Sequence, residues 1–476
     1  MDPKLPTPQT THPQSHPSLP GPDPRPCRRP AGRKPHPSLE PARVAENLIQ
    51  VLRRVFPDLF LWLRDLPDPR VREMCRYTAS HLWWHIIATY LSRSGSRNAF
   101  DEQRQVGQAA WNMGELCGQA ATDPRFEGQP MVTCSDNAAR HAARVDPEAV
   151  AWIVVQMMQV LLERRTFENA RLLGQYYILL FDGTVQEKCR AGFSEGGKSG
   201  SGEARYRYVL QVVLVGPAGT TFPLMHEHMD LIDPQQDKED CELECFRRLA
   251  HRLKTTFPKR SFCVVGDALY CCQAVVTLCE QYEWKYVLTL KEGRQPTTWG
   301  EVLRLLPLHR GQRMRLRLGQ DGREGLQDSV WFEQVLFGPR HTNVILTGEI
   351  TAEAATLYAF ITNFTDLSPQ RVLQIANNAG RERHRIEDIF NTQKNHGIGL
   401  EHVFCAQANA SKNYYSMMQV AQILWILSCE GVLRRLYAWA RRATQQGLAR
   451  AFWEGMKAVR IPSDLPPIGQ IRFGLA

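Results

Sequence analysis

Two apolar runs of the chain each end in an aspartate. Asp182 closes the run in ILLFDGT, and Asp267 closes the run in CVVGDALY. Short apolar runs that end at Gly and Asp are typical of buried strands. A single aspartate at a strand end is usually a cap or turn residue. Two at the ends of neighbouring parallel strands can converge on one point, so both are candidates for one site.

A third chemical element lies in the segment RERHRIEDIFNTQK. On a helix of 3.6 residues per turn, Arg383, Glu387 and Lys394 fall within about 40° of one another. The adjacent face is apolar and is expected to pack on a sheet; it consists of Ile386, Ile389 and Phe390. The helix thus presents one carboxylate flanked by two cations. The alternative is a surface helix with an ordinary i,i+4 Arg–Glu pair.

The run GFSEGGKSG (192–200) has the spelling of a phosphate-binding loop, through Gly192, Gly197, Lys198 and Ser199. Such a loop needs a buried strand before it and a helix after it, because the helix N-terminus faces the phosphates. Here the preceding residues are polar, and the following segment alternates as a strand does. We therefore interpret the run as a Gly/Ser-rich hairpin loop and do not expect an ATPase.

The composition sets limits on function. The 476 residues carry a net charge of +9, which favours a polyanionic partner but also fits a solvated basic surface. The 13 cysteines contain no C-x-x-C, and the spacings in CELEC and MHEHMD fit no common zinc site. We interpret the cysteines as reduced and structural, in a reducing cytoplasm. The apolar run at 150–162 is too short to span a bilayer.

Composition and periodicity divide the chain into six segments. They are a disordered Pro-rich tail (1–40), a helical and probable DNA-binding domain (41–170), a first α/β part (171–300), a β-rich insertion (301–365), a second part with the Glu387 helix (366–430) and a basic helical C-terminal segment (431–476).

Together these residues resemble the DDE transposases of the cut-and-paste insertion-sequence class, over about 170–430. In one branch of that family the third carboxylate lies in a Y-x-x-R-x-x-x-E-x-x-x-x-x-x-K signature. Arg383, Glu387 and Lys394 have that spacing, whereas Gly380 stands at the Tyr position. The resemblance implies an α/β fold: an RNase H-like catalytic core with a β-rich insertion, preceded by an all-α N-terminal domain.

The resemblance also implies the chemistry. Asp182, Asp267 and Glu387 would be the catalytic residues and the ligands of two Mg²⁺ ions, with Mn²⁺ able to substitute. Two such ions stabilise the attacking and leaving oxygens of phosphodiester transfer. Arg383 and Lys394 would hold phosphates, and Lys198 would contribute at most one further phosphate contact. Trp331 and Trp299 are candidates for stacking on a flipped base; the alternative is that both are core residues.

The expected partners are transposon-end DNA and target DNA, held by a homodimer, with no ATP and no membrane. The expected location is the cytoplasm, associated with the nucleoid, in a prokaryotic mobile element. Two alternatives remain open from the sequence: a domesticated, non-catalytic DNA-binding protein derived from a transposase, and a metal-dependent nuclease of the same fold.

Overall fold

The computed structural model describes residues 39–129, 131–189, 198–199, 205–229, 238–308, 312–320, 323–351 and 354–473. The expected disordered tail therefore lies outside the described residues, apart from Leu39 and Glu40.

The first part of the described chain is helical, as its three- and four-residue apolar steps predict. Its elements are α1 (Pro41–Val55), α2 (Leu59–Asp65), η1 (Arg72–Met74), α3 (Ala79–Leu91), α4 (Arg97–Asp101), α5 (Ala109–Cys117), η2 (Pro124–Phe126), α6 (Ser135–Ala142), α7 (Pro147–Glu163) and η3 (Glu168–Ala170). Asp146 and Pro147 form a typical start for helix α7, because Asp146 accepts a hydrogen bond from the Glu148 backbone N–H and Pro147 occupies the first turn.

Strands and helices alternate in the central part. The elements are β1 (Tyr177–Cys189), β2 (Lys198–Ser199), β3 (Arg205–Val215), η4 (Pro217–Gly219), β4 (Thr221–Met229), α8 (Lys238–Thr256), β5 (Phe262–Gly266), α9 (Gln273–Gln281), β6 (Lys285–Thr289), α10 (Pro296–Leu305), β7 (Arg313–Gln320), β8 (Arg323–Phe337), β9 (Arg340–Thr351) and β10 (Ala355–Thr362). The described fold is thus a mixed α/β fold.

The chain becomes helical again after β10. The elements are α11 (Pro369–Asn378), η5 (Gly380–Arg383), α12 (His384–Asn395), α13 (Ala408–Ser428), the π-helical turn η6 (Cys429–Leu433), α14 (Arg434–Leu436), α15 (Ala438–Arg442) and α16 (Gln445–Ala458). The segment after 368, expected to be helical, is broken at Ala379, whose backbone is not helical (φ −128°, ψ −65°).

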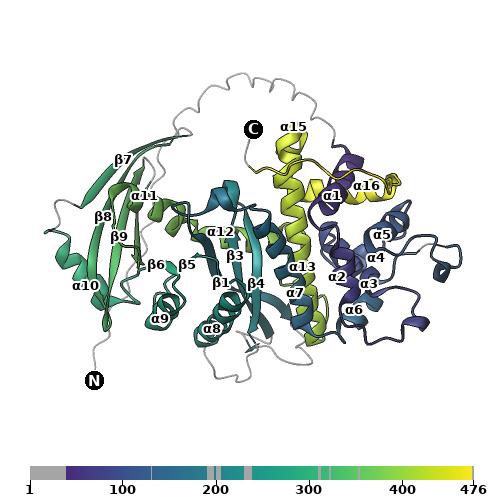
Figure 1. Ribbon diagram of the computed structural model, residues 1–476, viewed down its shortest axis with the longest axis horizontal. Helices are drawn as coiled ribbons and strands as arrows, with labels where there is room; N and C mark the ends of the chain where they lie inside the picture. The colour runs from purple at the N-terminus through teal and green to yellow at the C-terminus, as the bar shows by residue number, and fades with distance from the viewer. Residues whose placement is uncertain are drawn as a thin grey trace, which may run out of the picture. The chain divides into compact units, whose positions relative to one another are not determined.

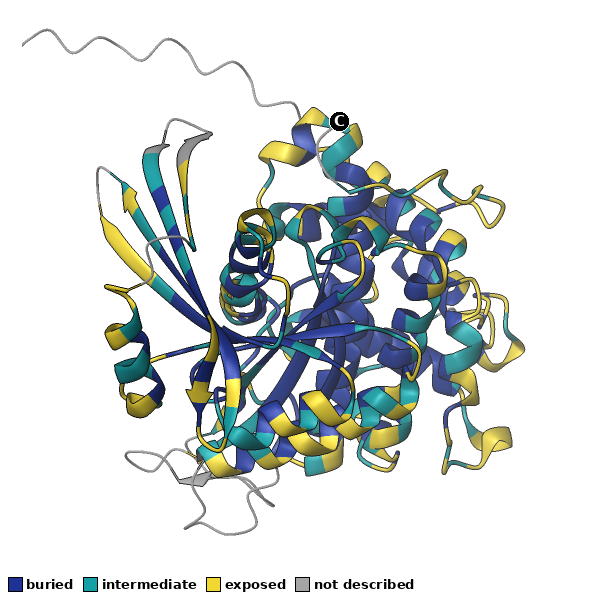
Figure 2. Cartoon of the chain, turned by 60° about the vertical axis from the view of Figure 1, so that its left-hand side comes forward, coloured by how far each residue is buried: buried dark blue, intermediate teal, exposed yellow. Residues whose placement is uncertain are grey.

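The strands form one ten-stranded sheet in the order β2-β3-β1-β5-β6-β10-β9-β8-β7, with β4 paired to β3. Strand β1 is antiparallel to β3 and parallel to β5, and β5 is parallel to β6. The strands of the expected insertion continue this sheet, because β10 pairs antiparallel with β6. In Figure 2 the centre of the sheet is buried, whereas the ends of the outer strands are exposed.

Helix α13 lies between the sheet and the N-terminal helices (Figure 1). All of its residues except Ala408, Asn409 and Lys412 are buried. Asn413 donates to the backbone oxygens of Ala142 and Val145, at 2.7 and 2.9 Å. Ser428 donates to Asn47 of α1 at 2.7 Å. Helices from the two ends of the described chain therefore share one core.

One helical run of the described residues, Ala408–Leu436, is long and apolar enough to cross a membrane. Its most apolar window has a mean hydropathy of 1.3. That window is 94% buried inside the fold, as in a core helix. The bent pair α6 and α7 passes the same test only when the two helices are counted as one span.

Candidate active site

The two aspartates lie on adjacent strands. Strand β1 pairs in parallel with β5 from Tyr177↔Phe262 to Leu180↔Val265, and the same register continued by two residues brings Asp182 level with Asp267. Asp267 directly follows β5, as expected. The sequence predicted that Asp182 would end its strand, and this was wrong. Strand β1 continues to Cys189 because β3 pairs with it from Leu179 to Cys189.

Helix α12 brings the third carboxylate to Asp182. Its apolar face is buried through Ile386, Ile389 and Phe390, as the periodicity predicts. Arg383 precedes the helix and forms an ion pair with Glu387, and its Nη1 lies 4.0 Å from Asp182 Oδ2. One guanidinium thus joins the carboxylates of a strand and a helix that are far apart in the sequence.

A further carboxylate, Glu242 of α8, lies beside this group and was not predicted. Its side chain is buried and accepts a hydrogen bond from the Tyr270 hydroxyl at 2.7 Å. A Cβ on Gly183 would lie 2.4 Å from Glu242 Oε2, so the acid packs directly against the residue that follows Asp182. The signal was present in the sequence, because Glu242 interrupts the apolar stripe of α8 formed with Phe246 and Leu249.

The crowding of acids changes the protonation of Asp182. Burial, and then the neighbouring charges of Glu242, Asp267 and Glu387, raise the pKa of Asp182 to about 7, and Arg383 opposes the shift. In the absence of a cation, the aspartate is therefore close to half-protonated at neutral pH. A carboxylate cluster with one guanidinium is short of positive charge.

The donor set fits a hard divalent cation in kind, since Asp182 and Asp267 offer carboxylate oxygens. Asp267 Oδ1 meanwhile accepts a hydrogen bond from the Leu269 backbone N–H at 2.8 Å. Within the described ranges no three His, Cys, Asp or Glu side chains are gathered closely enough to hold a metal ion as they stand. Glu387 would have to exchange its partner Arg383 for the cation.

A pocket of about 720 Å³ opens beside Asp267. Its lining includes Trp299, Tyr358, Lys291 and Arg383, which combine aromatic faces with positive charge. Trp299 is half-buried, so one part of its ring system is available to the pocket. The arrangement can accommodate a planar group next to an anionic group.

The remaining predicted contacts lie elsewhere. Trp331 of β8 is only 3% exposed and belongs to the core, so the structure does not bring it to the pocket. Lys394 of α12 pairs with Glu401 at 2.7 Å, so its charge already has a partner within the fold. Of the run 192–200, only the β2 backbone at Lys198 and Ser199 is described, and the rest, with the Lys198 side chain, lies outside the described residues.

Gly380, which replaces the signature tyrosine, has a packing reason. A Cβ at this position would lie 2.6 Å from Cζ of Phe360 on β10. A tyrosine does not fit there unless the Phe360 ring moves. The departure from the signature therefore belongs to the way η5 packs on the sheet.

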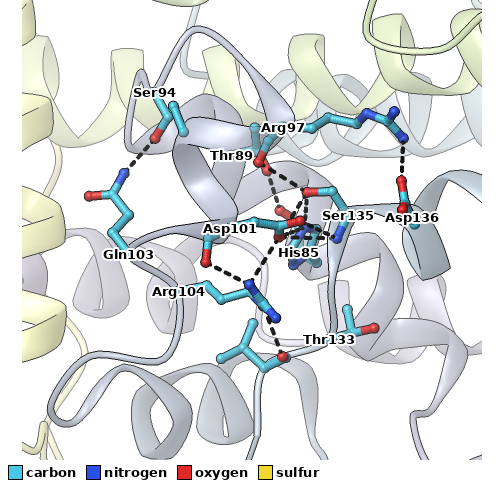
Figure 3. A network of polar contacts seen from close by, with 12 residues as sticks. His85, Thr89, Ser94, Arg97, Asp101, Gln103, Arg104, Thr133, Ser135 and Asp136 are labelled. Carbon is cyan, nitrogen blue, oxygen red and sulfur yellow. Dashed lines mark hydrogen bonds and ion pairs between the residues drawn. The ribbon is translucent and has the colours of Figure 1, made fainter.

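A second polar cluster joins α3, α4 and α6 (Figure 3). Ser135 Oγ lies 2.9 Å from His85 Nε2 and 3.0 Å from Asp101 Oδ1, so the cluster has the residue types of a nucleophile, a base and an acid. In a catalytic triad the acid bonds the second ring nitrogen of the base. Here Asp101 bonds Ser135 instead, and the second ring nitrogen of His85 has no hydrogen-bond partner among the described residues. Asp101 also accepts from the Ser135 backbone N–H and so caps α6.

Comparisons with known proteins add little. No family model matches the sequence, and no curated protein matches it. Among solved structures, the chain is similar to the cryo-EM structure of the piggyBac transposase synaptic complex with hairpin DNA, with a TM-score of 0.37 and 8% sequence identity. The match covers 88% of this chain and 81% of that chain. A likeness at this level carries no argument about fold or function. The function is therefore argued from the geometry of the candidate active site.

Proposed function

We propose that the protein is a DNA transposase of the DDE type, which cleaves transposon ends and joins them to target DNA by metal-dependent phosphodiester transfer. The observation that carries the proposal is the convergence of Asp182, Asp267 and Glu387, from two level strand positions and one helix, around Arg383. The sheet order β4-β3-β1-β5-β6, antiparallel and then parallel, supports an RNase H-like core.

The residues have separate parts in this proposal. Asp182, Asp267 and Glu387 would hold Mg²⁺, which when bound stabilises the charge that develops during displacement at phosphorus. Arg383 would hold a phosphate oxygen through its fork of N–H donors once Glu387 leaves it for the cation. The aromatic pocket with Trp299 would receive a nucleotide beside the cleaved bond. The remaining proposed features, namely a homodimer and a mobile prokaryotic element, follow from the resemblance.

Substitution of the carboxylates tests the proposal. We expect Asp182→Asn, Asp267→Asn and Glu387→Gln each to abolish Mg²⁺-dependent cleavage of DNA that carries the sequences flanking the gene, with DNA binding retained. The matched control is Asp388→Asn, because Asp388 is next to Glu387 on α12, is exposed and pairs only with His384 among the described residues. Full strand transfer by any of the three variants would contradict the assignment.

The products separate this proposal from the two alternatives. A transposase joins the freed 3′ end to a second duplex, whereas a nuclease of the same fold only hydrolyses. A domesticated DNA-binding protein binds the same DNA with no cleavage in Mg²⁺ or Mn²⁺. Joined products in a gel assay, which disappear with Asp182→Asn, are the expected result.

A further inference from the structure

A basic pocket lies apart from the candidate active site, where α1 and α7 end and the segment after α16 passes. Its volume is about 520 Å³. Among the described residues, four arginines and no acidic side chain line it: Arg54, Arg164, Arg165 and Arg472. We call this the arginine pocket.

The segment after α16 is anchored so that it completes the arginine pocket. Ile471 packs against Gly431, where a Cβ would lie 2.6 Å from the isoleucine side chain. The ring of Phe473 meets that of Phe222 edge-on at 5.8 Å. The Arg472 backbone N–H donates to the Gly431 oxygen at 3.3 Å. Arg472 is exposed between these two anchored residues, and its Nε and Nη2 donate to Gln470 Oε1 at 2.9 and 2.6 Å.

The charges of the arginine pocket are not neutralised within the described part of the chain. None of its four arginines forms an ion pair with a described carboxylate, whereas nearby Arg171 and Arg434 pair with Glu168 and Glu430. The negative ends of the α1 and α7 dipoles favour cations and account for Arg54 and Arg164. They do not account for Arg472, which lies outside any helix.

Arg165 carries the sharpest signal. Its backbone is left-handed (φ 56°), and it follows α7 with the two hydrogen bonds of a Schellman turn, Arg165 N to Leu162 O and Thr166 N to Leu161 O. Glycine is the usual residue at this position, since it adopts the conformation without strain. An arginine there costs stability, and its side chain lines the arginine pocket.

We infer that the arginine pocket binds the phosphate backbone of duplex DNA as a second contact surface outside the active site. Four guanidinium groups in one concavity, none in an ion pair with a described carboxylate, match closely spaced phosphates in charge and in hydrogen-bond geometry. Contacts of this kind position the duplex without reading its sequence. The inference rests on the proposed function in one respect, that DNA is the substrate.

The test is the salt dependence of binding to a fluorescent DNA duplex, with EDTA present so that no cleavage occurs. The variants are Arg54→Gln, Arg165→Gly and Arg472→Gln. Each is expected to lower the slope of log affinity against log salt by about 0.9 and to weaken binding about five- to tenfold near 0.1 M salt. The matched control is Arg43→Gln, because Arg43 is exposed on the same helix as Arg54 and pairs with Glu40.

Arg165→Gly keeps the test falsifiable if another variant misfolds. Glycine relieves the left-handed backbone, so the unfolding midpoint should stay equal or rise while DNA binding weakens. Wild-type slope and affinity in all three variants would overturn the inference. Equal binding of a polyglutamate chain through the same arginines would also overturn it.

The outcomes separate this inference from the proposed function. Asp182→Asn should keep the wild-type salt slope and lose cleavage. If the arginine variants change the slope but the wild-type protein joins no DNA, the arginine pocket stands and the transposase proposal fails. If cleavage depends on Asp182 but the arginine variants keep the wild-type salt slope, the transposase proposal stands and the inference about the arginine pocket fails.

Discussion

At the level of single residues, Arg383 opposes the crowding of acids in the candidate active site. It forms ion pairs with Asp182 and with Glu387 at the same time. Its charge is spread over several acids, so it offsets only part of their repulsion, and burial with Glu242 leaves the pKa of Asp182 at about 7. A bound cation would reduce the repulsion between these carboxylates.

The first prediction concerns this stored repulsion. The pKa of Asp182 rises from 3.8 to about 7 on folding, so its contribution to stability is fully present below pH 3.8 and is lost as the pH rises through 7. Asp182→Asn should therefore stabilise the fold in EDTA at pH 8 by up to about 4 kcal/mol, and by roughly 1–2 kcal/mol at pH 5. Urea unfolding at the two pH values measures the difference. A variant that is less stable at pH 8 would contradict the account.

The second prediction concerns the close contact behind Asp182. In Gly183→Ala the new methyl group would overlap Glu242 Oε2 and approach Met229 Cε at 2.9 Å. We expect a loss of about 1–3 kcal/mol in unfolding free energy and a larger proportional loss of cleavage, because Glu242 must move. Gly293→Ala is the control, since nothing lies within 4 Å of its Cβ position. Equal effects of the two substitutions would refute the close packing.

Residue types and spacing were sufficient to predict part of the site. Asp182, Asp267, Arg383 and Glu387 do gather, because strand ends and helix periodicity are local properties of the sequence. Glu242 was missed, since only the packing of α8 on the sheet brings its carboxylate to Gly183. For the same reason the sequence did not distinguish Trp299, which lines the pocket, from Trp331, which is buried.

At the scale of helices and strands, a chain of buried side-chain amides holds helix α12 in place. Gln393 of α12 donates to Gln419 Oε1 of α13 at 3.1 Å, and Gln211 of β3 donates to the same oxygen at 3.0 Å. Gln211 is the residue paired directly opposite Asp182. The helix that carries Glu387 is therefore tied to the strand next to the aspartate.

The third prediction tests this tie. Gln419→Leu removes the shared acceptor and leaves two buried amides without it, which should cost about 2–4 kcal/mol in unfolding free energy. Cleavage should fall further than the folded fraction does, because α12 loses its tether. Tyr415→Phe removes only the hydroxyl that donates to Gln211 and should cost about 1 kcal/mol. Cleavage that simply follows the folded fraction in Gln419→Leu would show that α12 needs no tether.

Most helices and strands were predictable from periodicity, but their pairing was not. Alternation predicts β7 to β10 as strands without naming their neighbours. The antiparallel pairing of β10 with β6, from Phe360↔Thr289 to Thr362↔Val287, makes them part of the main sheet. The break before α12 was also missed, because it arises where Gly380 meets Phe360.

Buried histidines make the stability of the whole fold depend on pH. Burial lowers the pKa of His81 and His141 to about 4, and of His85 and His226 to about 3. A histidine with a lowered pKa contributes stability that is present above pH 6.5 and is lost as the pH falls toward its folded value. Burial lowers the pKa of His228 and His402 as well. Asp182 and Glu187, whose pKa values burial raises, act in the opposite direction but are fewer than the histidines.

The fourth prediction is therefore a loss of stability in mild acid. Each buried histidine contributes up to about 1.4 kcal/mol per pH unit between pH 6.5 and 4. The urea midpoint should fall steeply between pH 6.5 and 5 and stay nearly level between 7 and 8. A level midpoint from pH 7 to pH 5 would mean that these rings are hydrated in solution.

The shared core of the first and last helices has a consequence for biosynthesis. Asn112 of α5 donates to the backbone oxygens of Met456 and Val459, each at 2.8 Å, and Asn47 and Ala142 bond to α13 and its end. At usual translation rates the ribosome needs about 20–80 s to pass from α1 to α16. During that time the nascent N-terminal helices lack the partners that cover their apolar faces, so nearly the entire chain has to be released before this core can close.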